Sequence, residues 1–176
     1  ILTGEDIWCQ GFSEPGAGSD LAGIRTRSVR DGNGWRVNGS KIWTTLASHA
    51  SQMILLTKGD GDHPRYSGMN FFLMPMDLDG VEVVPIRKMT GEFGFCQVFL
   101  NDVFIPDDCL IGGEGNGWQV AMRTLTYERQ VTGGQGGGHG GNFMVGGHLI
   151  EAARQCRSGG RPALEDPILR DRLVDV

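Results

Sequence analysis

A long succession of short apolar segments, broken by turn residues, constrains the fold of this chain more than any other feature. From Ile7 to about Ile111, Gly, Asn, Asp or Pro residues separate one segment from the next. No segment shows the three- or four-residue spacing of an amphipathic helix. The expected strands are 23–30, 35–37, 41–45, 53–57, 70–74, 81–84, 97–100 and 103–105. Roughly six to eight strands at this spacing predict a mainly β fold, either a barrel or a sandwich.

Turn residues suggest how some of these strands connect. Asp31-Gly32-Asn33-Gly34 contains several residues that tolerate a positive φ, which predicts a hairpin between 23–30 and 35–37. Asn38-Gly39 is a second tight-turn signal, so the chain is expected to reverse again there. Pro75 is expected to end the strand before it, because proline has no N–H to donate to a ladder.

The pattern changes at the glycine-rich joint 112–117. Trp118, Met122 and Leu125 then lie three or four residues apart, which predicts a helix. We therefore expect a β domain over 1–116 and the start of a truncated helical domain over 117–176. Further helix is expected over 143–157 and after Asp166. The run from Gly133 to Gly141 holds seven glycines, which would cost about 7 kcal/mol as helix interior relative to alanine.

Composition and charge exclude several classes of function. A net charge of −5 argues against nucleic acid as a main partner. No apolar run approaches the roughly 20 residues of a membrane span, and no signal peptide is visible. The four cysteines contain no Cys-x-x-Cys motif, so free thiols in a reducing compartment are expected. The four histidines lack metal-ligand spacing, so no metal site is expected.

Two polar stretches point to a ligand. The residues 12–20, Phe-Ser-Glu-Pro-Gly-Ala-Gly-Ser-Asp, combine hydroxyls, a proline and two glycines. Such a loop lets a ligand approach the main chain, and clustered N–H groups can receive an anion. Downstream, the segment 41–45 sets Trp43 beside two threonine hydroxyls. Together they predict a site for a flat, phosphate-bearing cofactor.

The same residues carry a resemblance to a known family. The stretch 13–20 resembles the signature of the acyl-CoA dehydrogenases, which are FAD enzymes that desaturate acyl-CoA thioesters. Three further pieces agree in order and spacing: Lys41-Ile42-Trp43-Thr44-Thr45, 98–106 and 115–122. The resemblance covers essentially the whole chain. It implies the middle β-barrel domain of that family, followed by an incomplete part of its C-terminal helical domain.

The resemblance also implies which residues meet FAD. Residues from Gln10 to Ser19 would line the flavin ring and its pyrophosphate, with Ser13 near the pyrimidine edge. Trp43 would pack on the ring, and Thr45 would hydrogen-bond near its reactive nitrogen. The full implied set is Gln10, Phe12, Ser13, Gly18, Ser19, Trp43, Thr44 and Thr45. Phe12 stands where the family usually has an aliphatic residue, and Thr44 replaces a common isoleucine.

The implied substrate is an acyl-CoA thioester. Ser19, Thr126, Tyr127 and Arg129 would contact it. A carboxylate would remove the α proton while the flavin accepts the β hydride. The usual catalytic glutamate of the family lies beyond Val176. A minority of members place the base on this helix, at a position that aligns with Glu128, although a Glu-Arg pair there is also common as a structural ion pair.

The family resemblance also implies partners, a pathway and a location, and it leaves two alternatives open. The family would imply electron transfer to an electron-transfer flavoprotein, assembly as a homodimer or homotetramer, and a role in fatty-acid β-oxidation. It would also imply a cytoplasmic location, or the mitochondrial matrix in a eukaryote. An acyl-CoA oxidase or a flavin monooxygenase could use the same scaffold. A β-barrel binding module without chemistry is the alternative from another class.

Overall fold

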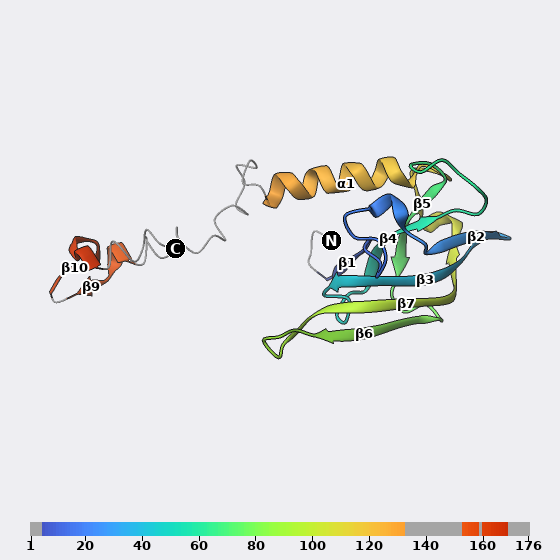
Figure 1. Cartoon of the computed structure of the whole chain (residues 1–176). Helices are drawn as coiled ribbons and strands as arrows, with labels where there is room; N and C mark the ends of the chain where they lie inside the picture. The colour runs from blue at the N-terminus through green and yellow to red at the C-terminus, as the bar shows by residue number, and fades with distance from the viewer. Residues whose placement is uncertain (1–4, 133–152, 159, 169–176) are drawn as a thin grey trace. The chain divides into compact units, whose positions relative to one another are not determined.

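The structure, a computed structural model, describes residues 5–132, 153–158 and 160–168 (Figure 1). The chain divides into two compact units, Ile1–Arg123 and Thr124–Val176. The run from Gly133 to Gly141 lies outside the described residues, as does most of the helix expected over 143–157. Within the described part, no helix combines the length and apolar character needed to cross a bilayer.

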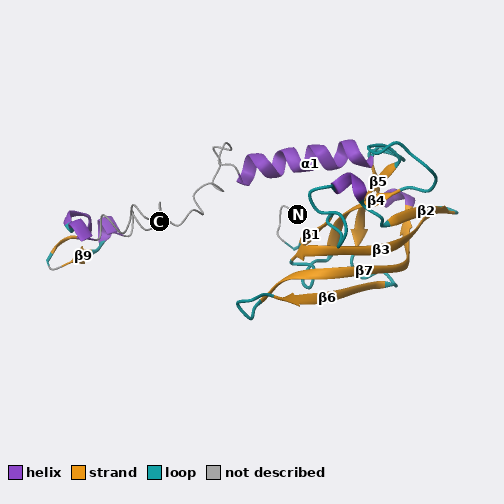
Figure 2. Ribbon diagram, viewed as in Figure 1, coloured by secondary structure: helices purple, strands orange, loops and turns teal. Residues whose placement is uncertain are grey.

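The first unit is built on an eight-stranded sheet (Figure 2). Its strands are β1 (Trp8–Gly11), β2 (Arg27–Asp31), β3 (Gly34–Thr45), β4 (Gln52–Lys58), β5 (Met69–Pro75), β6 (Val81–Arg87), β7 (Phe93–Pro106) and β8 (Leu110–Ile111). Two short 3-10 turns, η1 (Leu21–Gly23) and η2 (Asp107–Cys109), join them. The prediction of a mainly β fold is confirmed.

The order of the strands is β6-β7-β3-β2-β4-β5-β8, and β1 pairs with β4. β1 and β2 run parallel to β4, whereas the other neighbours are antiparallel. Among the described residues, no ladder joins β6 to β8, so the sheet has two ends. The expected closure into a barrel is therefore not confirmed.

The expected turn at Asn38-Gly39 is wrong, because both residues lie inside the continuous strand β3. Between Val37 and Gly39 the register with β7 shifts by one residue. The Asn38 amide oxygen accepts the Asp102 N–H at 2.8 Å in this irregularity. A Cβ on Gly39 would lie 2.6 Å from the Cα of Thr26. Asn-Gly here therefore serves a β-bulge and a close backbone approach, which use the same residue types as a turn.

Two other boundaries differ from the expected ones. Residues 97–100 and 103–105 belong to one strand, β7, which passes through Asp102 at a φ of +55°. The strand expected over 23–30 begins only at Arg27, because Leu21–Gly23 forms η1. Pro75 is the last residue of β5, as expected.

The core lies against strands β3, β4, β5 and β7. Its most deeply buried side chains, each at 0–1% exposure, include Val37, Met53, Leu55, Phe72, Met74, Val98, Leu100, Val103 and Ile105. Trp35 meets Phe72 edge-to-face, with ring centroids 5.9 Å apart. Both faces of β4 are largely buried, which explains its unbroken apolar sequence.

A buried polar network fixes the start of the helix α1 (Gly117–Thr132) on the sheet. Asn70 donates to the Ser28 hydroxyl at 2.9 Å and accepts the Gly115 N–H at 2.9 Å. Gly117 sits so close to β5 that an added Cβ would lie 2.6 Å from the Asn70 carbonyl carbon. Trp118 then packs on Tyr66, with ring centroids 5.0 Å apart. The predicted helix start is confirmed.

The second unit contains the C-terminal part of α1, a two-stranded ribbon and a 3-10 turn. The ribbon pairs β9 (Arg157–Ser158) with β10 (Arg161–Pro162), and η4 (Ala163–Glu165) follows. Arg157, expected at the end of a helix, therefore lies in a strand.

Candidate cofactor site

The loop from Phe12 to Asp20 leaves β1 and passes beside β3. Glu14 and Ala17 exchange two backbone hydrogen bonds, of 2.9 and 3.0 Å, which make a tight turn around Pro15 and Gly16. The Ile42 N–H donates to the Ser13 carbonyl at 2.9 Å. This bond places the two polar stretches of the sequence side by side, as the cofactor-site prediction requires.

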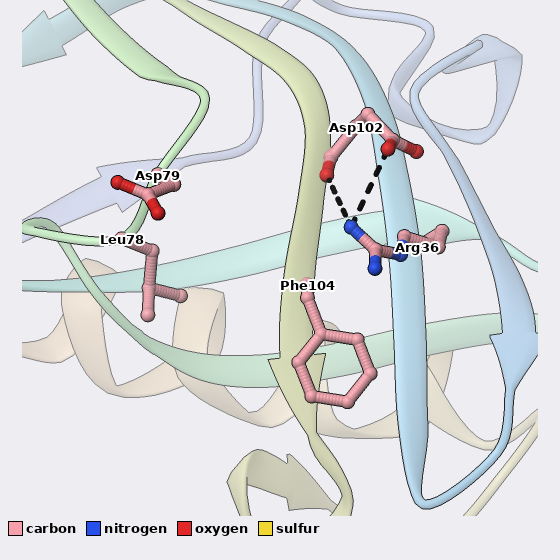
Figure 3. A pocket seen from close by; sticks show the side chains of 5 residues that line it. All are labelled: Arg36, Leu78, Asp79, Asp102 and Phe104. Atoms are coloured by element: carbon pink, nitrogen blue, oxygen red, sulfur yellow. Dashed lines mark hydrogen bonds and ion pairs between the residues drawn. The ribbon is translucent and has the colours of Figure 1, made fainter.

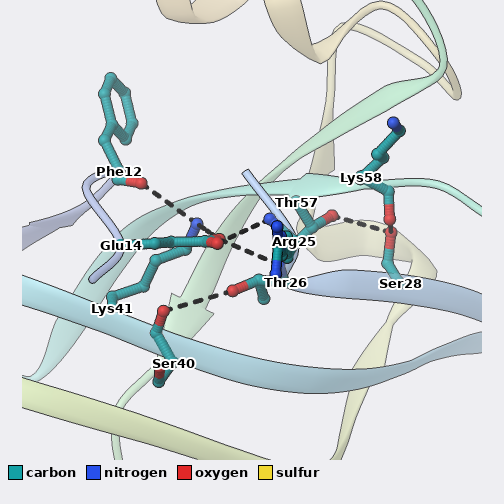
Figure 4. Close-up of polar contacts among 9 residues, drawn as sticks. All are labelled: Phe12, Glu14, Arg25, Thr26, Ser28, Ser40, Lys41, Thr57 and Lys58. Carbon is teal, nitrogen blue, oxygen red and sulfur yellow. Dashed lines mark hydrogen bonds and ion pairs between the residues drawn. The ribbon is translucent and has the colours of Figure 1, made fainter. Parts of the chain in front are cut away.

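A buried ion pair joins the same loop to the same strand (Figure 4). The Lys41 ammonium lies 2.8 Å from Glu14 Oε1 and also donates to the Phe12 carbonyl at 3.2 Å. Lys41 is 0% exposed and Glu14 is 8% exposed. The Glu14 carboxylate accepts two more bonds, from the N–H groups of Arg25 at 2.6 Å and Thr26 at 2.9 Å. It thus connects the beginning of the loop to the segment that follows η1.

Burial and pairing act in opposite directions on these two groups. Burial lowers the pKa of Lys41 to about 8, and the neighbouring Glu14 charge offsets only part of that effect. For Glu14, burial alone would raise the pKa. The Lys41 charge and the hydrogen bonds from Lys41, Thr26 and Arg25 outweigh it, so the pKa of Glu14 lies below its usual value.

Trp43 follows this pair directly and has an unusual backbone. Its φ is +60°, in the left-handed region, and it lies where the register between β3 and β7 shifts from Lys41 to Thr44. A bulge of this kind redirects a side chain. The indole is 58% exposed and contacts Phe95 edge-on, with ring centroids 6.1 Å apart. The structure therefore leaves a large aromatic side chain exposed to solvent, two residues after the lysine that contacts the loop.

The two threonines after Trp43 differ in environment. Thr45 is exposed, on the same strand as the indole. Thr44 is 1% exposed, and its hydroxyl has no hydrogen-bond partner within the described part of the chain. Its side chain thus lies in the interior. An isoleucine, which the resemblance makes common at this position, would suit that interior without an unpaired polar atom.

Two family models together match most of this chain. Residues 9–103 match the acyl-CoA dehydrogenase middle domain, and residues 115–176 match the acyl-CoA dehydrogenase C-terminal domain. The chain belongs to the acyl-CoA dehydrogenase family. The resemblance found in the sequence is confirmed.

Individual relatives support the same assignment. The chain is 40% identical over 170 residues to the acyl-CoA dehydrogenase IpdE1 of Mycobacterium tuberculosis, covering 96% of this chain and 42% of that protein. The solved structure of the Tcur3481-Tcur3483 steroid ACAD matches with a TM-score of 0.74 at 30% identity, over 99% of this chain and 43% of that one. A glutaryl-CoA dehydrogenase from Mycobacterium smegmatis, solved in complex with FADH2, matches with a TM-score of 0.65 at 25% identity, over 98% and 43%.

The chain spans less than half the length of the curated relatives it matches: 18%, 42% and 45% for the first three. The residues of this chain therefore correspond to less than half of each of these relatives.

The remaining FAD residues expected for an acyl-CoA dehydrogenase lie in and beside the loop. Gln10 and Ser13 are half-buried, whereas Gly18 and Ser19 are exposed. Phe12 is 3% exposed and packs edge-on against Phe71, with centroids 5.8 Å apart. Its ring is thus part of the interior, and its carbonyl is taken by Lys41.

The residues expected to contact substrate on the helix lie in the second unit. Thr126, Tyr127, Glu128 and Arg129 are all exposed on α1. The Arg129 guanidinium donates to the Leu125 carbonyl at 3.3 Å, which is a contact within the helix. Their assignment to substrate or to proton transfer stays a prediction.

The sequence did not reveal the Glu14–Lys41 pair. The available signal was Lys41 itself, a cation at a position where the strand alternation places an inward-facing side chain. Such a residue is buried only with a partner. The carboxylate of the 12–20 stretch that could serve as this partner is Glu14.

A pocket that was not predicted from the sequence lies on another part of the sheet. This pocket of about 380 Å³ is lined by Arg36, Leu78, Asp79, Asp102 and Phe104 (Figure 3). Arg36 Nε donates to Asp31 at 2.8 Å, and Arg36 Nη1 donates to the Asp102 carbonyl at 3.0 Å. The cation of this pocket is thus already bound to carboxylate and carbonyl oxygens. Over the described residues, no group of three or more His, Cys, Asp or Glu side chains could hold a metal.

Proposed function

We propose that this chain forms the middle β domain and the start of the C-terminal helical domain of an FAD-dependent acyl-CoA dehydrogenase, with the boundary near Asn116. The complete protein would desaturate an acyl-CoA thioester between its α and β carbons and pass the electrons to an electron-transfer flavoprotein. The observation that carries this proposal is the exposed indole of Trp43, held at a positive φ beside the loop of residues 12–20.

The chain's own residues fit a flavin on physical grounds. A large aromatic side chain in the left-handed region is costly, and such strain is found mostly at functional sites. An exposed indole loses its water-facing apolar area when a flat ring covers it. The match to a relative solved with FADH2 supports the same ligand.

We assign roles to the loop and the strand as follows. Trp43 covers one face of the flavin ring, and the exposed Thr45 hydroxyl can bond to the ring edge. Ser13 and Gln10 lie nearer the sheet and orient the ring. The exposed Gly18 and Ser19 receive the pyrophosphate, and Ser19 also meets the acyl-CoA. Phe12 and Thr44 contribute through backbone groups, because their side chains are buried.

Bound FAD would supply the two-electron acceptor that no side chain provides. The chain's residues would bind it, orient it and shield one face from water. Thr126, Tyr127 and Arg129 would contact the acyl-CoA. The α proton requires a carboxylate, which is either Glu128 or a glutamate elsewhere in the complete protein.

The test is FAD retention by the full-length protein with Trp43→Ala, set against Val29→Ala as a matched control. Val29 is another exposed apolar side chain, 41% exposed, on β2 of the same sheet. It pairs with Arg36, seven positions before Trp43 on β3. We expect Trp43→Ala to weaken FAD binding at least tenfold, which corresponds to about 1.4 kcal/mol, and Val29→Ala to leave it unchanged. Equal FAD occupancy in both variants would exclude the proposed role of Trp43.

A further inference from the structure

The Glu14–Lys41 ion pair also forms hydrogen bonds to the backbone. Four hydrogen bonds converge on it: Lys41 to Phe12 and to Glu14, and the Arg25 and Thr26 N–H groups to Glu14. The carboxylate accepts from three donors, and the ammonium, which has three N–H groups, donates to two acceptors. Two groups sealed from water thus connect three separate stretches of the chain.

These stretches are the beginning of the loop, the segment after η1 and the strand beside the loop. Phe12 and Glu14 open the loop, Arg25 and Thr26 follow η1, and Lys41 lies two residues before Trp43. The Ile42 N–H bond to Ser13 adds a further contact to the same register. The pair therefore determines where the loop stands relative to the indole.

Few other contacts shape the part of the loop that faces solvent. Pro15, Gly16, Gly18, Ser19 and Asp20 are exposed. A Cβ added to Gly16 or Gly18 would touch nothing within 4 Å. Ala17 is buried, and Asp20 forms an exposed ion pair with Arg65. Exposed ion pairs contribute little, typically below about 1 kcal/mol. The anchors of the loop are thus Phe12, Ala17, the Ile42 N–H bond to the Ser13 carbonyl and the buried pair.

We propose that Glu14 and Lys41 are positioning residues for the cofactor: they hold the loop of residues 12–20 closed against β3, in the arrangement that can receive FAD beside Trp43. The cofactor half of this statement rests on the function proposed above. Neither side chain touches the cofactor, because both are buried. They act through Ser13, Ser19 and Trp43.

A quantitative consequence follows from population arithmetic. If only the closed loop binds FAD, the apparent dissociation constant rises in inverse proportion to the closed fraction. A variant that closes the loop one time in ten should bind FAD about tenfold more weakly. The closed loop should also protect the Arg25 and Thr26 amides from exchange, since their acceptor is Glu14.

The test uses the full-length protein with Lys41→Met, which keeps the buried stem and removes the charge. Thr57→Val is the matched control. Thr57 is fully buried on β4, and its hydroxyl bonds to Ser28 Oγ at 2.8 Å, away from the loop. Both variants lose a buried polar contact of the same sheet. Only Lys41→Met should disturb the loop.

We expect amide exchange without FAD to accelerate at Arg25, Thr26 and Ile42 in Lys41→Met, while the amides of β5 remain protected. We expect its FAD dissociation constant to exceed that of Thr57→Val at least tenfold, with an altered visible absorption spectrum of any bound flavin. Unchanged exchange at Arg25 and Thr26 would overturn the proposal. FAD affinity equal to that of Thr57→Val would also overturn it, since the pair would then be merely structural.

Glu14→Gln serves as a second variant if Lys41→Met does not fold. A glutamine retains one acceptor oxygen but turns an NH2 group toward a donor, so the same two readouts should change in the same direction. Failure of the proposed function looks different: the wild-type protein would take up no FAD. The exchange measurement would still decide whether the pair holds the loop.

Discussion

The backbone of Trp43 allows the strain at the candidate site to be measured directly. A left-handed conformation costs an L-residue about 1–2 kcal/mol, a penalty that glycine does not incur. Elsewhere in a strand, glycine is about 0.5–1 kcal/mol less stable than alanine, because it loses more chain entropy on folding. We compare Trp43→Gly with Trp43→Ala. Both variants remove the indole and its contact with Phe95, so these losses cancel between them.

The reference pair is Val29→Gly and Val29→Ala, at an exposed position of β2 that is not among the positive-φ residues. At Val29, alanine should be the more stable of the two by the ordinary margin. At Trp43, glycine should equal or exceed alanine. The difference between the two positions isolates the strain, and we expect it to be about 1–2 kcal/mol in favour of glycine at Trp43.

Urea unfolding of the four variants provides the assay. With slopes of about 1–3 kcal/mol/M, a difference of this size moves the relative midpoints by roughly 0.3–2 M. A glycine-minus-alanine difference that is the same at Trp43 and Val29 would refute strain at Trp43. The bulge would then hold its left-handed residue without cost.

Three further predictions concern single side chains. Thr44→Val should leave the free energy of unfolding unchanged or raise it by up to about 1–3 kcal/mol, since it removes an unpaired buried hydroxyl. Thr57→Val should lower the free energy of unfolding. An equal loss in both variants, measured by urea unfolding, would contradict this prediction. Folding lowers the pKa of Glu14. Its contribution to stability is therefore present at pH values above the unfolded-state pKa of about 4.3 and is lost as pH falls through the folded-state pKa. The difference in stability between wild type and Glu14→Gln should narrow in acid, and a difference that stays constant from pH 7 to pH 3 would contradict this prediction. Glu128→Gln should leave turnover of the full-length enzyme largely intact, and a fall of several orders of magnitude would instead identify Glu128 as the base.

Periodicity predicted most of the sheet, because strands with one or two buried faces have recognisable sequences. Met53 to Thr57 and Asn70 to Met74 fall inside β4 and β5 for this reason. The errors came where one residue type serves two structures. Asn38-Gly39 suits a turn or a bulge, and only the approach of Thr26 decides which. Whether a sheet closes depends on pairing between distant edges, which no local pattern specifies.

The candidate site was predictable as a composition but not as an arrangement. Hydroxyls, glycines and Trp43 suggested a flat ligand, and the structure brings the two stretches together through Ser13 and Ile42. The charge of Lys41 was visible in the sequence, yet its burial depends on partners 27 and 29 residues away. The positive φ of Trp43 had no signal, because tryptophan is not a residue that favours it.

The close packing of Gly117 against the backbone of Asn70 has a consequence for engineering. Secondary structure suggests cutting the protein in the glycine-rich joint at 112–116, just before the helix. The first compact unit, however, continues to Arg123. Within it Gly115 and Gly117 contact β5, and Trp118 contacts Tyr66 in the loop between β4 and β5. The first turns of α1 thus belong to the same compact unit as the sheet. A chimera that exchanges helical domains between relatives should place the junction after Arg123, so that each sheet keeps the helical turns that pack against its own unit.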